Sequence, residues 1–145
     1  MIIMAVDIGT VRTGIAVSDA GERFAFPKAV ITERNREKLI AALAAKAAEY
    51  GAGLLVVGHP KNMDASEGFK AKECAAAAEQ LQAATGLETL LWDERCTTVL
   101  AHDALRSSGM RGKKHRDVVD AVAAVMILEN YLRYRQLHPA KDSDT

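Results

Sequence analysis

Short apolar runs alternate with longer amphipathic stretches along the chain, and their order predicts the secondary structure. Three closely spaced strand-like runs at the start are typical of an antiparallel meander. Helices that alternate with strands further on indicate parallel strands joined by right-handed crossovers. The fold class is therefore α/β, a mixed five-stranded sheet with helices on both faces. The expected strands are Ile2–Val6, Gly14–Ser18, Phe24–Ile31, Leu54–Gly58 and Leu87–Trp92, and the expected helices are Arg34–Tyr50, Ser66–Thr85, Thr97–Ser107 and Asp117–Leu137.

Proline and glycine positions indicate the kind of strand formed by the third run and the ends of two helices. Pro27 lies inside the third strand-like run, and proline cannot donate a hydrogen bond to a neighbouring strand. We therefore expect that run to form an edge strand or a bulged one. Gly51 and Gly86 directly follow two of the helical stretches and are expected to end those helices.

The composition limits the number of domains and the surfaces that the protein can present. The 145 residues, 49% of them hydrophobic, are most simply one domain over residues 1–137, followed by a flexible polar tail over residues 138–145. The 19 Lys and Arg residues balance 19 Asp and Glu residues. Any surface that binds nucleic acid must therefore be a local basic patch.

Cysteine content and hydropathy bear on where the protein acts. Cys74 and Cys96 are too few for a disulfide framework and lack the paired spacing of a zinc site, so we expect reduced thiols and a cytoplasmic location. No apolar run approaches the roughly 20 residues of a membrane span. The chain starts directly with strand-like sequence, so we expect neither a signal peptide nor a membrane partner.

Asp7 is the first candidate functional residue. It ends a near-continuous apolar run and is followed by a turn at Gly9 and Thr10. A carboxylate beside a buried strand is costly to desolvate, so we expect a cation, a metal ion or a phosphate-binding environment around it. A solvated Asp that caps the turn is the simpler alternative.

Two further acidic positions have comparable settings. Asp93 and Glu94 directly follow the fifth strand-like run, and ligands gather at the carboxyl ends of parallel strands. Asp120 is the only residue between Val118 and Leu128 that is not apolar. A helix this apolar is expected to be buried on most sides, and Asp120 with it.

Carboxylates in these places could converge on Mg²⁺ or Mn²⁺. Mg²⁺ prefers a few carboxylates and several retained waters, and a pair of such ions can promote hydrolysis of a phosphodiester. Asp117 lies three residues before Asp120 and could join the site. We favour a different role for Asp117, at the start of the helix, where an acid complements the helix dipole.

A basic segment precedes the last helix. Residues 106–116 contain no acid but include two glycines, which is typical of a mobile basic loop that holds a polyanion. A solvated run of charge is the alternative. The basic residues are Arg106, Arg111, Lys113, Lys114, His115 and Arg116.

Other polar candidates lie close to the acids in sequence. Arg12 and Arg95 could each bind phosphate or form a salt bridge that holds a carboxylate. Asn62 lies in a strand-to-helix loop, where a helix N-terminus favours an anion, and Ser66 is expected to be the N-cap of that helix. His59 is expected to form hydrogen bonds within the loop.

Four motifs in this order resemble those of the YqgF (RuvX) family of bacterial Holliday-junction-resolvase-like proteins, from residue 1 to about residue 135. The resemblance implies a ribonuclease H-like fold, with Asp7, Glu94 and Asp120 as a metal-binding catalytic triad. The motifs are Asp7-Ile8-Gly9-Thr10 with Arg12 and Gly14, Val57 to Gly68, Asp93-Glu94-Arg95 with Thr97 and Thr98, and Lys113-Lys114 ahead of Asp117 to Ala124.

The resemblance also implies an activity, that of a nuclease that helps to mature the 5′ end of pre-16S ribosomal RNA. We expect a monomer that acts on precursor RNA; a Holliday-junction resolvase and a weakly catalytic nucleic-acid-binding factor are the alternatives. The Asp-x-Gly-Thr turn also occurs in ATPases of the sugar kinase, actin and Hsp70 class, but their architecture requires two such domains. The expected nucleic-acid-binding residues are Arg12, Asn62, Arg95, Arg111, Lys113, Lys114 and Arg116.

Overall fold

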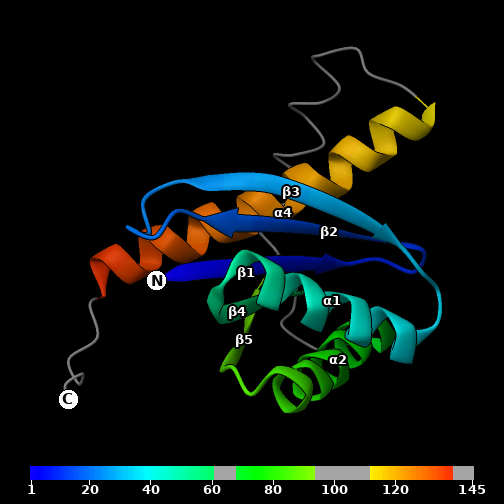
Figure 1. Ribbon diagram of the computed structural model, residues 1–145. Coiled ribbons are helices and arrows are strands. Elements are labelled where there is room, and N and C mark those ends of the chain that lie inside the picture. The colour runs from blue at the N-terminus through cyan, green and yellow to red at the C-terminus, as the bar shows by residue number, and fades with distance from the viewer. Residues whose placement is uncertain (61–67, 94–111, 139–145) are drawn as a thin grey trace.

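The computed structural model shows a five-stranded sheet between two layers of helix (Figure 1). It describes residues 1–60, 68–93 and 112–138, and in the last of these segments the side chains from residue 122 onward. The elements are β1 (Ile2–Ile8), β2 (Arg12–Ser18), β3 (Ala25–Thr32), α1 (Arg36–Tyr50), β4 (Ala52–His59), α2 (Phe69–Thr85), β5 (Thr89–Asp93) and α4 (Gly112–Leu137). None of these helices is long and apolar enough to cross a membrane.

The strand order in the sheet is β3-β2-β1-β4-β5. The first three strands pair antiparallel as a meander, whereas β4 pairs parallel with both β1 and β5. The mixed five-stranded sheet predicted from the sequence is therefore confirmed. β1 lies at its centre, with strands on both sides.

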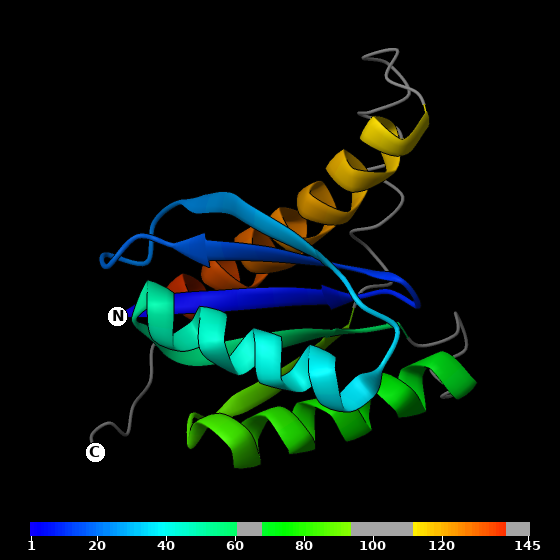
Figure 2. The same cartoon turned by 45° about the vertical axis from the view of Figure 1, so that its right-hand side comes forward.

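The two faces of the sheet carry separate layers of helix (Figure 2). Side chains alternate along β1, so Met4 and Val6 pack against α1 and α2, while Ile3 and Ala5 pack with Ala124 and its neighbours on α4. All five are fully buried. Helices on both faces, also predicted, are confirmed.

The position of Pro27 is explained by the place of β3 in the sheet. β3 is an edge strand, so one side of its backbone needs no partner. The pairing with β2 shifts register here: Ile15 lies opposite Ala29 and Ala16 lies opposite Pro27, which leaves Lys28 as an extra residue. The strand is therefore both an edge strand and a bulged one.

Several predicted element boundaries were wrong. β1 continues past Val6 to Ile8, so Asp7 lies within the strand and pairs with Gly14 of β2. The N-cap of α2 is Gly68, not Ser66, and no side chain caps that end of the helix. By contrast, Asn35 caps α1 by accepting a hydrogen bond from the Lys38 N–H.

The last helix begins earlier than predicted. α4 starts at Gly112, so positions 113 to 116 belong to the helix and not to a preceding loop. Asp117 is the sixth residue of α4, beyond the first turn in which an acid complements the helix dipole, so the predicted role at the helix start was wrong. The expected helix Thr97–Ser107 lies outside the described residues.

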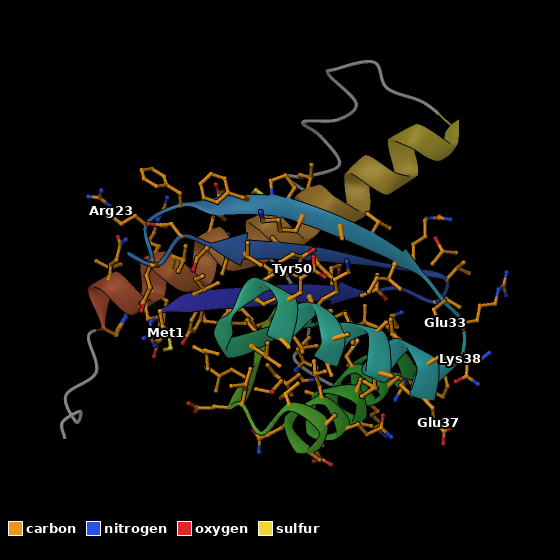
Figure 3. All side chains as sticks on the ribbon, viewed as in Figure 1. Met1, Arg23, Glu33, Glu37, Lys38 and Tyr50 are labelled. Carbon is orange, nitrogen blue, oxygen red and sulfur yellow. The ribbon has the colours of Figure 1, made fainter. Side chains whose placement is uncertain are left out.

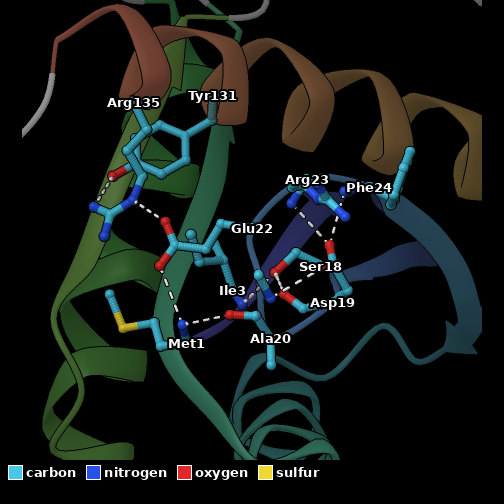
Figure 4. Close-up of polar contacts among 11 residues, drawn as sticks. Met1, Ile3, Ser18, Asp19, Ala20, Glu22, Arg23, Phe24, Tyr131 and Arg135 are labelled. Carbon is cyan, nitrogen blue, oxygen red and sulfur yellow. Dashed lines mark hydrogen bonds and ion pairs between the residues drawn. The ribbon is translucent and has the colours of Figure 1, made fainter.

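A charged cluster anchors the C-terminal end of α4 to the amino end of the sheet (Figure 4). Arg135 Nε donates a hydrogen bond to Glu22 Oε1 at 2.7 Å, and the N-terminal ammonium of Met1 lies 3.1 Å from Glu22 Oε2. The Arg135 hydrogen bond is the main reason why the pKa of Glu22 lies below its ordinary value. Glu22 therefore stabilises the fold in its ionised form.

We predict that Arg135→Gln lowers the free energy of unfolding by about 1 kcal/mol at neutral pH, since it removes a charge-assisted hydrogen bond. A lowered pKa in the folded state contributes stability above the pKa of the unfolded chain, and this contribution is lost as the pH falls. The difference from wild type should therefore shrink in acid. Denaturant unfolding at several pH values measures it, and Lys46→Gln, which removes the exposed pair with Glu49 and the contact with the Tyr50 ring but nothing at Glu22, is the control.

Thr13 gives a second stability prediction. It is fully buried, and its hydroxyl has no hydrogen-bond partner in the part of the chain that the structure describes. Thr13→Val should therefore stabilise the fold by about 1 kcal/mol, because it removes a buried unsatisfied group at nearly constant volume. Thr85→Val should do the reverse, since the Thr85 hydroxyl donates to the Leu81 carbonyl and accepts from the Leu87 N–H. Equal melting-temperature shifts in the two variants would contradict this account.

Candidate nuclease site

Three parallel strands end at the same edge of the sheet. β1 ends at Ile8, β4 at His59 and β5 at Asp93, with His59 directly opposite Asp93. This carboxyl edge is where loops and helix starts converge in α/β folds, so it is the natural place for a ligand. We call it the carboxyl edge below.

Asp7 lies at this edge, one residue before the end of β1. It follows Ile3 and Ala5 on alternate positions of the strand, and both of those side chains face α4. The strand periodicity therefore directs Asp7 toward the same face. Asp7 is half-buried, and its cross-strand partner is Gly14, which is buried.

Arg12 shares that face with Asp7. It is the first residue of β2 and lies two positions before Gly14, so it is a diagonal neighbour of Asp7 across the antiparallel pair. Long side chains in this relation are within reach of each other. Both predicted roles of Arg12, holding the carboxylate and binding a phosphate, are compatible with this place.

The direction of α4 brings position 120 toward Asp7. Arg135, near the C-terminal end of α4, contacts Glu22 and so lies at the amino end of β1. Earlier residues of α4 therefore lie progressively nearer the carboxyl edge (Figure 1). Position 120 comes one helical turn before Ala124, which packs against the same face of β1 as Asp7. Two of the three predicted acids thus lie on facing elements.

An aromatic contact fixes the end of β5 to α4. The Trp92 ring meets Tyr131 edge to face, with centroids 5.6 Å apart, and lies 5.5 Å from Tyr134. Since Trp92 faces α4, the alternation of the strand turns Asp93 toward α1 and α2. Asp93 is therefore directed away from Asp7.

Several predicted residues lie outside the described structure. Among the described residues, no group of three or more His, Cys, Asp or Glu could hold a metal ion. The triad remains a prediction, because Glu94 and the side chain of Asp120 are not among the described parts. The same holds for Asn62, Arg95 and Arg111, and for the side chains of Lys113, Lys114, Arg116 and Asp117.

His59 differs from its prediction. It was expected in a loop, but it is the last residue of β4 and only 5% exposed. The apolar run that precedes His59 ends at Gly58, and histidine gives no strand signal of its own. The predicted strand therefore ended one residue too early. His59 is a candidate for holding the end of the sheet together and not a solvated loop residue.

Sequence reasoning also missed a cavity of about 170 Å³ at the carboxyl edge. It lies on the side of β1 that faces α1 and α2, and its rim includes Arg34, Arg36 and Lys70. The available signal was the presence of basic residues at the starts of two helices. We call this cavity the cationic pocket.

Comparisons with known proteins agree with the geometry. A protein from Lachnospira eligens is 41% identical over 139 residues, which covers 94% of this chain and 99% of the relative. One from an Anaeromyxobacter species is 42% identical over 129 residues, or 89% and 94% of the two chains. Both are provisionally named pre-16S rRNA nucleases.

Solved structures of Holliday-junction resolvases share the fold. Thermus thermophilus RuvC in complex with a Holliday junction superposes with a TM-score of 0.59 at 14% identity, over 95% of this chain and 97% of that one. The fowlpox virus resolvase with its junction DNA gives 0.58 at 13%, over 92% and 98%. The predicted ribonuclease H-like fold is confirmed. The RuvX family, described as Holliday junction resolvases, matches residues 1–134, and this chain belongs to that family.

Proposed function

We propose that this protein is a metal-dependent nuclease that hydrolyses phosphodiester bonds in precursor 16S rRNA, in the cytoplasm. The observation that supports the proposal is that Asp7 lies near the end of β1, on the strand face that α4 covers, and that position 120 of α4 comes one helical turn before Ala124 on that face. The provisional names of the relatives supply the substrate. We propose 5′-end maturation as the processing step.

The residues at the carboxyl edge fit a divalent metal ion. Asp7 offers a half-buried carboxylate near the end of β1, and oxygen ligands of this kind suit Mg²⁺ or Mn²⁺. We propose Glu94 and Asp120 as the other protein ligands. When bound, such an ion supplies the Lewis acidity that activates water and stabilises a leaving oxygen.

Basic residues complete the proposed site. Arg12 lies beside Asp7 and would orient a phosphate or hold the carboxylate in place. The first turns of α4 extend past the sheet at the carboxyl edge (Figure 2), and they carry Lys113, Lys114 and Arg116. We propose that these residues, with Asn62, Arg95 and Arg111, contact the backbone of the nucleic acid.

RNA is the proposed substrate, and DNA junctions are the second candidate. The family description and the folds of two resolvases favour the junction. A resolvase that cuts two symmetric strands would be expected to act as a dimer. A precursor RNA requires only one metal site and one basic groove, which a monomer can provide.

We predict that Asp7→Asn, Glu94→Gln and Asp120→Asn each reduce cleavage by several orders of magnitude in Mg²⁺ or Mn²⁺. Each change removes a negative ligand at nearly constant volume, so the fold should survive, and relief of carboxylate repulsion should keep the melting temperature at or above that of wild type. Asp93→Asn is the matched control and should cleave close to the wild-type rate. If Asp120→Asn retained full activity, Asp117 would take its place in the proposal.

The substrate is tested by offering purified protein a 5′-extended 16S precursor and a four-way DNA junction side by side, at equal concentration. We expect cleavage of the RNA that leaves a 5′ phosphate, abolished in Asp7→Asn. Paired symmetric nicks in the junction, with the precursor left intact, would reject RNA in favour of DNA. No cleavage of either substrate would reject the nuclease itself.

Gly9 gives a separate test of the site geometry. A Cβ at this position would lie 2.2 Å from the Arg12 carbonyl oxygen, so any side chain must shift the turn between Asp7 and Arg12. Gly9→Ala should therefore lower cleavage by roughly 100-fold, since a misplacement of about 1 Å has effects of that size. Gly51→Ala is the control: its φ of 70° makes alanine strained, but it lies at the far end of α1. It should lower stability and leave the cleavage rate unchanged.

A further inference from the structure

The cationic pocket has an apolar floor and a charged rim. Ile8, Leu39 and Cys74 are buried beneath it, and Gly9 and Thr10 border it from the turn after β1. The turn is tied to the rim by a hydrogen bond from the Glu33 N–H to the Val11 carbonyl, at 2.8 Å. Because Ile8 directly follows Asp7, the pocket adjoins the proposed metal site, on the opposite face of the same strand.

The charges on the rim do not balance. Arg36 pairs with Glu73, at 3.9 Å, and Glu33 accepts a hydrogen bond from the Asn35 N–H. Arg34 and Lys70 form no ion pair within the segments that the structure describes. The rim therefore carries Arg34, Arg36 and Lys70 against Glu33 and Glu73, one positive charge in excess, and neither Arg34 nor Lys70 is paired with a carboxylate of the described segments.

The positions of these cations are unfavourable for helix stability. Lys70 lies in the first turn of α2, and that turn contains no acid and has no side-chain cap at Gly68. Arg36 is the first residue of α1. Positive charge at a helix N-terminus opposes the helix dipole, so helix stability does not account for Lys70. At α1 the charge of Arg36 is offset by Glu37 in the same turn and by the pair with Glu73. An anion in the pocket would relieve the repulsion.

We propose that the cationic pocket binds a backbone phosphate of the substrate, with Arg34 and Lys70 as its main contacts. This inference rests on the proposed nuclease function and extends it: the nucleic acid would cross the carboxyl edge over the end of β1. One phosphodiester would lie at Asp7 on the α4 face, and a neighbouring phosphate would lie in the pocket on the α1 and α2 face. The pocket would thereby position the strand for cleavage without taking part in the chemistry.

The test is the double variant Arg34→Gln/Lys70→Gln, made in an Asp7→Asn background so that the RNA stays intact. A single-stranded RNA oligonucleotide that spans the 5′ processing site is the probe, titrated at several salt concentrations. Loss of two phosphate contacts should reduce the slope of log affinity against log salt by about 1.4, which is roughly a 25-fold loss of affinity at 0.1 M relative to 1 M salt.

The matched control is Arg23→Gln/Lys28→Gln, which removes the same charge elsewhere. Arg23 lies at the end of the molecule opposite Glu33 and the pocket (Figure 3), and Lys28 lies over the ring of Tyr50, at the far end of α1. The control should keep the wild-type salt slope. An equal change in both double variants, or no change in either, would overturn the proposal.

Thermal unfolding separates a binding role from a structural one. The pocket variant should melt at or above the wild-type temperature, because it removes repulsion at a helix N-terminus. A lower melting temperature together with weaker binding would assign the residues to the fold and overturn the proposal. If the pocket variant weakens RNA binding while the protein with Asp7 intact cleaves no RNA, the pocket is supported and the nuclease function is rejected. Weakened binding of a four-way DNA junction alone would overturn the assignment to RNA.

Discussion

Burial of β1 on both faces is the constraint on which the rest of the structure depends. Residues from Ile3 to Val6 are fully buried, alternately against α4 and against α1 and α2. A charge within that stretch would be desolvated at high cost, so a carboxylate on β1 is tolerated only where the strand leaves the core. Position 7 is that place. The polar chemistry of the protein therefore gathers at the carboxyl edge and not at the centre of the sheet.

The orientation of α4 is the second constraint, and the opposite end of the molecule sets it. Arg135, Glu22 and the N-terminal ammonium hold the C-terminal end of α4 against the amino end of the sheet. The helix then runs back across β1, β2 and β3, so that its early turns reach the carboxyl edge. The apolar packing of α4 on the sheet and this remote ion pair together determine which residues of α4 can approach Asp7.

Much of the fold could be predicted from the apolar pattern. The succession of elements along the chain, the mixed pairing, the edge position of the third strand and the two helical layers follow from alternating runs, from Pro27 and from the spacing of elements. The ends of the strands and helices were harder to predict from the sequence. β1 extends to Ile8 because Asp7 pairs with Gly14 of β2. α4 begins within a basic segment whose composition resembles that of a loop. At β1 a contact between strands outweighs the local pattern.

The sequence by itself determined which residues are candidates for catalysis: a carboxylate at the end of a buried strand and an acid in an apolar helix. The family resemblance assigns both to one site. Only the tertiary structure decided how they are arranged. Whether Asp93 faces Asp7 depends on the side to which Trp92 packs, and whether Arg34 and Lys70 share a cavity depends on how α1 and α2 lie against the sheet. Local patterns specify periodicity along one element. Proximity between elements arises from packing, which no single segment of the chain encodes.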